Sequence, residues 1–242
     1  MSVKKHLPNL ITSLNLLCGC FAIVFIFEEE WFIAALLVLL ASVFDFFDGF
    51  IARLLNVAGD MGKQMDSLAD MVTFGVVPGM LVFKIVNKYA LIQNFEIFAA
   101  YTWLPYLAFL IPVFSAFRLA KFNIDSRQQD QFIGLPTPAN TLFFISFPII
   151  SHFQGDNSFI HPLFSQPIVL LSVSTLFSLL LVTEIPMFAL KFKNFGWAEN
   201  KIRYVYIMLV MVLFILFHYT AIPLSIILYI LISTIIYLFK WG

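Results

Sequence analysis

Residues 45–70 read DFFDGFIARLLNVAGDMGKQMDSLAD, and four aspartates stand in this stretch, which lies between apolar runs. Asp45 and Asp48 are three residues apart, and Asp66 and Asp70 are four apart. Both spacings place the two carboxylates of a pair on one face of a helix. The stretch therefore predicts two antiparallel helices, each of which presents two carboxylates to the other.

The apolar runs around this stretch indicate the class of the protein. Of its 242 residues, 61% are hydrophobic and only 12% are charged, whereas soluble domains are about half apolar and a quarter charged. A helix needs about 20 apolar residues to cross a bilayer. We therefore expect an all-α, polytopic transmembrane bundle of about eight helices, with six or seven as alternatives. The expected spans are 10–27, 31–54, 64–87, 95–120, 137–153, 167–190, 203–219 and 222–240.

The cations are distributed unevenly over the predicted loops. Of the 14 Lys and Arg residues, only Lys84 and Lys88 fall on one side of the membrane. Because cytoplasmic loops carry the excess of Lys and Arg, the other side and both termini should face the cytoplasm of an integral cell (inner) membrane protein. A formal net charge of zero gives no reason to expect nucleic acid as a partner. The cations assigned to the cytoplasmic side are Lys4, Lys5, Arg53, Lys63, Arg118, Lys121, Arg127, Lys191, Lys193, Lys201, Arg203 and Lys240.

The four aspartates are expected just inside the cytoplasmic edge of the membrane. At ~1.5 Å per helical residue they lie about 5 to 10 Å within the hydrocarbon core. Even one acid at mid-helix costs about 2.5–3.5 kcal/mol on insertion scales, and Arg53 is the only base in these spans nearby. Protonation, several basic partners or bound cations could compensate the charge. Oxygen-only ligation suits Mg²⁺ or Mn²⁺ better than zinc, so we expect two divalent ions here.

Small residues and one cation accompany the acids. Gly49 and Ala52 leave the acidic face of the helix without bulk, so that a nucleotide could approach the backbone. Arg53 supplies a planar fork of donors that is suited to phosphate. A nucleotide and phosphate site beside the aspartates is therefore expected.

Taken together, eight residues match the pattern D-x2-D-G-x2-A-R-x8-G-x3-D-x3-D at every fixed position. This pattern resembles the signature of the CDP-alcohol phosphotransferase family. The resemblance extends over about the first 140 residues, and it predicts a catalytic core at 1–140 and additional transmembrane helices at 141–242 within one integral-membrane domain, 1–242. The matching residues are Asp45, Asp48, Gly49, Ala52, Arg53, Gly62, Asp66 and Asp70.

What the resemblance implies is transfer of a phosphatidyl group from CDP-diacylglycerol to an alcohol, with release of CMP. The family is a helical membrane bundle whose catalytic cavity lies at the cytoplasmic face, and a homodimer is implied too. Asp70 would be a metal ligand and the general base. The other implied metal ligands are Asp45, Asp48 and Asp66, and the implied cytidine and phosphate site consists of Gly49, Ala52 and Arg53.

The first predicted helix also resembles the family. The segment LPNLITSLNLLCG, residues 7–19, is similar to the N-terminal helix of these enzymes, in which Asn9 and Thr12 would face the nucleotide. A proline at a helix start with a nearby hydroxyl explains the same residues without a ligand. Both interpretations stay open at this point.

Two later segments bear on the acceptor alcohol. FRLAKFN, residues 117–123, and FIGLPTPAN, residues 132–140, resemble segments of bacterial and archaeal phosphatidylserine synthases, which makes L-serine the expected acceptor. Two cations three residues apart at a helix end could hold a carboxylate or phosphate, although a positive-inside loop would also place cations there. The candidate acceptor-binding residues are Arg118, Lys121, Asn123 and Asn140.

Two other interpretations of the function remain open from the sequence. The same chemistry could serve glycerol 3-phosphate or an inositol phosphate as the acceptor. A cation or proton transporter would also place aspartates in the membrane, but it would usually show repeat symmetry, which this sequence lacks.

Glu184, which stands before Pro186 in the sixth predicted span, is expected to be a polar anchor between helices.

Overall fold

The computed structural model describes residues 6–57, 59–125, 132–155, 158–190, 194 and 196–239. Part of the charge asymmetry falls on residues outside this description, namely Lys4, Lys5, Arg127, Lys191, Lys193 and Lys240. Within the described part the fold is all-α and polytopic, with one short two-stranded sheet. The number of spans and the cytoplasmic position of the termini stay predictions.

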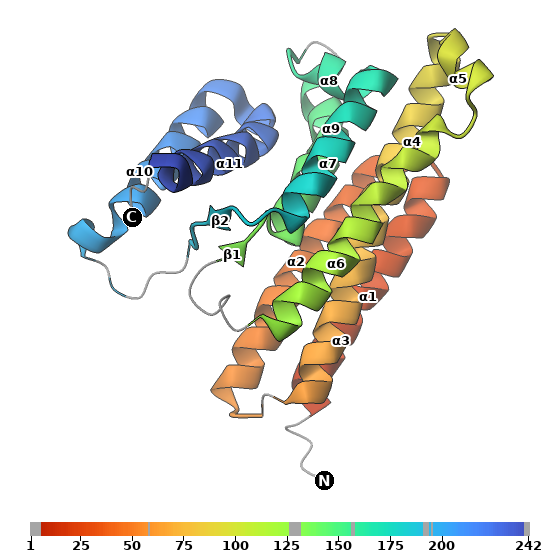
Figure 1. Ribbon diagram of the computed structural model, residues 1–242. Coiled ribbons are helices and arrows are strands. Elements are labelled where there is room, and N and C mark those ends of the chain that lie inside the picture. The colour runs from red at the N-terminus through yellow and green to blue at the C-terminus, as the bar shows by residue number, and fades with distance from the viewer. Residues whose placement is uncertain are drawn as a thin grey trace.

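The helices of the first half are four long segments with short connections. Figure 1 shows α1, α2, the α3–α4 segment and α6 running side by side. The start of α1, the end of α2 and the start of α3 lie at the same end of this bundle (Figure 1). The bounds are α1 His6–Phe27, α2 Trp31–Leu54, α3 Asp60–Asp70, η2 Met71–Val76, α4 Val77–Ile92, α5 Glu96–Ala100, η3 Leu104–Phe109 and α6 Leu110–Ile124.

The second half adds shorter helices and the sheet. The strands pair antiparallel, with Phe132 opposite Met187 and Ile133 opposite Pro186. α10 and α11 form a hairpin set at an angle to the long helices of the first half, and α11 packs against α7 (Figure 1). The bounds are β1 Phe132–Ile133, α7 Thr137–Gln154, α8 His161–Ser165, α9 Pro167–Val182, β2 Pro186–Met187, α10 Trp197–Phe217, η6 His218–Thr220 and α11 Ala221–Phe239.

Five helical segments of the described chain are long and apolar enough to cross a membrane. They are His6–Phe27, Trp31–Leu54, Asp60–Ile92, Leu104–Ile124 and Glu199–Phe239. Their outward faces carry exposed large apolar side chains, as expected where lipid replaces water as the surrounding medium.

Two predicted spans differ from the observed helices. The span 95–120 is replaced by the segment Leu104–Ile124, because Pro105 begins a new helical turn and leaves α5 as a short separate helix. The span 167–190 is too long, since α9 ends at Val182. A proline disfavours the helical conformation of the residue before it. The chain is therefore already extended where it reaches Pro186.

The first two helices pack closely through small residues. α1 and α2 make the most extensive contact between any two elements. Their buried faces include Ala22, Ala34, Ala35 and Ala41, whose small side chains let two backbones approach each other. Close packing of this pair sets the position of the carboxylates that α2 carries at its far end.

A π-helical segment, η2, continues α3 into α4 directly after Asp70. Pro78 at the start of α4 has no N–H to donate to the carbonyl of Phe74 four residues earlier. The hydroxyl of Thr141 on α7 donates to this carbonyl instead, at 2.8 Å. π-Segments occur frequently at functional sites, and this one joins the acidic part of the helix to the apolar core.

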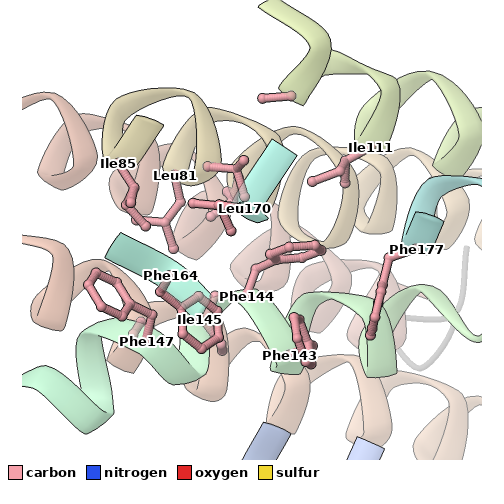
Figure 2. Packing of buried hydrophobic residues seen from close by; sticks show 14 of the residues in the cluster. Leu81, Ile85, Ile111, Phe143, Phe144, Ile145, Phe147, Phe164, Leu170 and Phe177 are labelled. Carbon is pink, nitrogen blue, oxygen red and sulfur yellow. The ribbon is translucent and has the colours of Figure 1, made fainter. Parts of the chain in front are cut away.

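The apolar core lies between α4, α6, α7, α8 and α9. Figure 2 shows aromatic side chains of α7 packed against Phe164 and Phe177, with Leu81 of α4 beside them. The ring centroids of Phe143 and Phe177 are 4.2 Å apart, and those of Phe147 and Phe164 are 5.1 Å apart. Burial of such rings is a large stabilising contribution, and it holds α7 against the helix that carries Asp70.

The short sheet fixes the start of α7 near the end of α9. The backbone N–H of Gly134 donates to Ile185 and that of Leu135 donates to Leu180, both at 2.9 Å. Gly134 has φ +76°, and a Cβ there would lie 2.5 Å from the carbonyl oxygen of Leu181. Only glycine fits such a position, so the FIGLP part of the segment 132–140 serves the fold.

Candidate active site

The structure brings the four aspartates together. Asp45 and Asp48 lie in the second half of α2, and Asp66 and Asp70 lie on α3. Carboxylate oxygens of Asp45, Asp48 and Asp66 come within 4.8 Å of one another. Asp45 also interacts directly with the carboxyl of Asp70. The spacing argument therefore placed the acids correctly, at one level shared by α2 and α3.

The donor set of this cluster fits a divalent cation. Asp48 and Asp70 are only 5% and 8% exposed, and the described residues contain just two ion pairs, Lys88–Glu29 and Lys121–Glu184, neither of which involves the cluster. Buried carboxylates without a compensating cation are costly. Carboxylate oxygens are the ligands that Mg²⁺ and Mn²⁺ prefer, so the residues present suit either ion.

α1 supplies a hydroxyl to the cluster. The Thr12 hydroxyl lies 2.6 Å from Oδ2 of Asp48 and 3.1 Å from the backbone carbonyl of Pro8. A hydroxyl has a single proton to donate, and the shorter contact is the one to the carboxylate. Thr12 is buried and contacts a metal-ligand candidate, and its contact with the nucleotide stays a prediction.

Two glycines of the signature make room for neighbouring polar groups. A Cβ on Gly62 would lie 3.4 Å from Oδ1 of Asn9, and a Cβ on Gly49 would lie 3.4 Å from Nη1 of Arg53. Arg53 is exposed near the end of α2, and Ala52 beside it is half-buried. Asn9 of α1 thus faces Gly62 of α3, and the guanidinium of Arg53 lies beside Gly49 on α2.

Asn15 is a site residue that the sequence argument did not identify. It is fully buried, and its Nδ2 donates to Oδ1 of Asp70 at 3.3 Å. The only sequence signal is its position three residues after Thr12, on the same face of an otherwise apolar helix. Because no local pattern states which helix that face meets, the contact became visible only in the fold.

Two of the four candidate acceptor residues are buried and incompletely paired. Arg118 is 6% exposed and donates from Nη1 to the hydroxyl of Thr137 at 3.3 Å, and it interacts electrostatically with Asp70. Within the described chain, its Nε has no hydrogen-bond partner. Asn140, one helical turn after Thr137, is fully buried, and neither atom of its side-chain amide has a partner among the described residues.

The other two candidate acceptor residues are engaged in contacts within the protein. Lys121 forms an ion pair with Glu184, which lies in the connection after α9 and ties it to α6, as expected of a polar anchor. Asn123 donates from Nδ2 to the hydroxyl of Ser67 at 2.8 Å, and its backbone carbonyl accepts from Nζ of Lys63 at 2.8 Å. These contacts join α6 to α3.

Comparison with known proteins gives consistent matches. The family model of the CDP-alcohol phosphatidyltransferases matches residues 5–178, which extends past 140 through α7 and most of α9. The chain is 37% identical over 138 residues, 55% of this chain and 70% of the relative, to the CDP-diacylglycerol–serine O-phosphatidyltransferase of Bacillus subtilis (strain 168).

Two further relatives come from another bacterium and from Methanothermobacter thermautotrophicus. The chain is 32% identical over 171 residues, 69% of this chain and 67% of the relative, to the CDP-diacylglycerol–serine O-phosphatidyltransferase of Helicobacter pylori (strain ATCC 700392 / 26695). It is 31% identical over 144 residues, 58% of this chain and 57% of the relative, to the archaetidylserine synthase of Methanothermobacter thermautotrophicus. The first name states a phosphatidyltransferase with serine, and the second states a synthase of archaetidylserine.

Proposed function

The chain belongs to the CDP-alcohol phosphatidyltransferase family, and we propose that it transfers the phosphatidyl group of CDP-diacylglycerol to L-serine, giving phosphatidylserine and CMP. The names of the bacterial relatives support serine as the acceptor. One structural observation carries the proposal: Asp70 is buried beside the other carboxylates and interacts electrostatically with Arg118, which is buried too. Arg118 can therefore hold the carboxylate of an acceptor whose hydroxyl lies beside Asp70, the base.

The metal ligands in this proposal are the oxygens of Asp45, Asp48 and Asp66, with Asp70 as a further ligand. Two divalent ions, Mg²⁺ or Mn²⁺, suit this set. When bound, such ions neutralise the negative charge that grows on the departing phosphate. The hydroxyl of Thr12, which donates to Asp48 at 2.6 Å, orients one ligand oxygen.

Asp70 is the proposed general base. The hydroxyl oxygen of serine attacks the phosphatidyl phosphorus, the bond from this phosphorus to the oxygen of CMP breaks, and CMP leaves with the electron pair. The hydroxyl proton passes to Asp70, which later returns it to water. A carboxylate within hydrogen-bond reach can perform this transfer, and the hydrogen bond from Asn15 to Oδ1 holds Asp70 in place.

The nucleotide is proposed to bind at the exposed edge of the cluster. Gly49 and Ala52 leave the helix face open there, and Arg53 is exposed and available to a phosphate. Asn9 faces the start of α3 across Gly62, where it can contact the base or ribose. The cluster of acids thus lies between the nucleotide edge and the buried acceptor side.

The pairing of the cations favours serine over a phosphorylated acceptor. Of the two predicted acceptor cations, Lys121 is paired with Glu184, which leaves Arg118. One guanidinium suits the single carboxylate of serine, whereas glycerol 3-phosphate or an inositol phosphate brings a doubly charged group. Asn140, whose amide has no partner among the described residues, is the proposed second contact to the acceptor, and Lys121 and Asn123 take supporting roles.

The remaining predictions about the setting of the enzyme are proposals as well. The excess of Lys and Arg at the aspartate end of the helices favours a cytoplasmic active site in the cell (inner) membrane. A homodimer remains what the family resemblance implies. The comparisons favour the transferase over a cation or proton transporter, because the family model matches residues 5–178, which include the four aspartates.

A panel of acceptors tests the function. Purified protein in lipid nanodiscs is incubated with CDP-diacylglycerol, Mn²⁺ or Mg²⁺, and in turn serine, glycerol 3-phosphate and inositol phosphate, and CMP release is measured. We expect CMP only with serine, together with phosphatidylserine. CMP release with glycerol 3-phosphate alone would reject serine as the acceptor, and no release with any acceptor would reject the transferase.

A further inference from the structure

Asn15 is held between two groups of the helix that carries Asp70. Its Nδ2 donates to Oδ1 of Asp70 at 3.3 Å, and its backbone carbonyl accepts from the hydroxyl of Thr73 at 3.2 Å. Asn15 and Thr73 are both fully buried. The two contacts fix the position of Asn15 from both its side chain and its backbone.

The helix seam around Asn15 leaves it little freedom to move. A Cβ on Gly19, one turn further along α1, would lie 2.5 Å from Oγ1 of Thr73. Only glycine permits so close an approach of α1 to η2. Asn15 therefore faces Asp70 at a point where α1 packs closely on η2.

The side-chain oxygen of Asn15 is left without a partner. No donor among the described residues lies within hydrogen-bond distance of its Oδ1, which is buried. An amide oxygen has two acceptor positions, and leaving it buried and unpaired is unfavourable. The oxygen lies on the same amide group that holds Asp70, so a molecule whose hydroxyl meets Asp70 lies beside it.

We propose that Asn15 is the residue that selects an amino alcohol as the acceptor. Its N–H holds one carboxylate oxygen of Asp70, and its Oδ1 accepts a hydrogen bond from the ammonium group of the acceptor. In serine the hydroxyl and the ammonium are on neighbouring carbons, which matches the neighbouring positions of Asp70 and Asn15. Arg118 takes the carboxylate. The inference rests on the proposed function and deepens it.

The same oxygen disfavours the alternative acceptors. An acceptor with no donor on the carbon next to its hydroxyl leaves Oδ1 of Asn15 unpaired, and a neutral hydroxyl there forms a weaker hydrogen bond than an ammonium group does. Sites that hydrogen-bond one substrate group discriminate strongly against analogues that lack it, and an unfavourable contact with the wrong partner adds to specificity.

The test compares serine with 3-hydroxypropionate, which has the same hydroxyl and carboxylate but no amino group. For each acceptor, kcat/KM is obtained from CMP release by the full-length protein in nanodiscs. We expect the wild type to favour serine by roughly 10- to 100-fold, the range for a hydrogen bond to a charged group. In Asn15→Leu, kcat falls for both acceptors and the preference shrinks to about 3-fold or less. A merely structural role would lower both values in proportion and leave the preference intact.

A second variant separates the two contacts of Asn15. Asn15→Asp keeps acceptor oxygens for the ammonium but has no N–H for Asp70, so kcat should fall while the preference for serine persists. Asn87→Leu is the matched control, because Asn87 is a half-buried asparagine of α4 that donates only to its own helix, at the carbonyl of Phe83. Its preference should equal that of the wild type.

The outcomes distinguish this inference from the proposed function. CMP release with serine but no preference over 3-hydroxypropionate, or an unchanged preference in Asn15→Leu, overturns the role of Asn15 and leaves the function standing. Loss of the preference for serine in Asn15→Asp also overturns the role of Asn15. If Asn15→Leu does not fold, the result with Asn15→Asp decides the question. No CMP release with serine by the wild type rejects both.

Discussion

The hydroxyl of Thr12 on α1 lies 2.6 Å from the carboxylate of Asp48 on α2, although the two residues are 36 positions apart in the chain. Asp48 is also one of three acids whose oxygens lie within 4.8 Å of one another. A hydrogen bond to a metal-ligand carboxylate fixes its orientation. Thr12 thus links the first helix to the acidic site.

Replacing Thr12 by valine should weaken metal binding. Thr12→Val keeps the shape of the side chain but removes the donor to Asp48, and loss of such a partner typically costs about 10- to 100-fold in metal affinity. Mn²⁺ binding followed by electron paramagnetic resonance measures this. Ser13→Ala is the control, because the exposed Ser13 donates only to the backbone of Asn9. Equal Mn²⁺ affinity in Thr12→Val and wild type would contradict the assignment.

Asp70→Asn should separate chemistry from binding. The amide cannot accept the proton of serine, so CMP release should fall by about 10²- to 10⁴-fold, the usual contribution of a positioned base. Binding of CMP, measured by isothermal calorimetry, should be retained in part because the other three acids remain. Asp60→Asn, in the exposed first turn of α3, should turn over normally. Unchanged turnover of Asp70→Asn would exclude Asp70 as the base.

Arg118 and Lys121 should differ in their effect on serine binding, although they are three residues apart. Arg118→Gln removes the buried cation and should raise the KM for serine by roughly 10-fold or more, since hydrogen bonds to charged groups are strong. Lys121→Gln breaks only the surface pair with Glu184, and such pairs contribute little. Its KM for serine should stay within about 3-fold of wild type. Similar effects of the two variants would place the serine carboxylate elsewhere.

Gly134→Ala should destabilise the fold without any direct contact with the site. Alanine there meets both a positive φ and the carbonyl oxygen of Leu181 at 2.5 Å. Gly155→Ala separates the effect of the positive φ from that of the steric contact, because Gly155 also has a positive φ, +65°, but no atom within 4 Å of a Cβ. Thermal unfolding should show Gly134→Ala to be less stable than Gly155→Ala by about 1–3 kcal/mol, the cost of overpacking. Equal stability would mean that the β1–β2 connection can shift.

Much of the active site could be predicted because its pattern is local. The spacing of Asp45, Asp48, Asp66 and Asp70 depends only on helix geometry, and the structure brings all four together. The fixed residues around them predicted the family, which the match over residues 5–178 confirms. Apolar run length likewise predicted an all-α membrane protein, although it overestimated the length of α9.

What could not be predicted depends on contacts between distant segments. The donation from Asn15 to Asp70 requires the register of α1 against α3, which neither helix encodes alone. The pairing of Lys121 with Glu184 removed a candidate acceptor cation because the chain after α9 returns to α6. The hydrogen bond from Thr141 to the carbonyl of Phe74, in the π-segment after Asp70, likewise joins residues of two helices.

Serine labelled with ¹⁸O in its hydroxyl group tests the central claim most directly. The wild-type protein is incubated with CDP-diacylglycerol, Mn²⁺ and the labelled serine, and both products are examined by mass spectrometry. Attack of the serine hydroxyl on the phosphatidyl phosphorus predicts that the label is retained in phosphatidylserine and absent from CMP. Label in CMP, or CMP released without labelled phosphatidylserine, would contradict the proposed transfer.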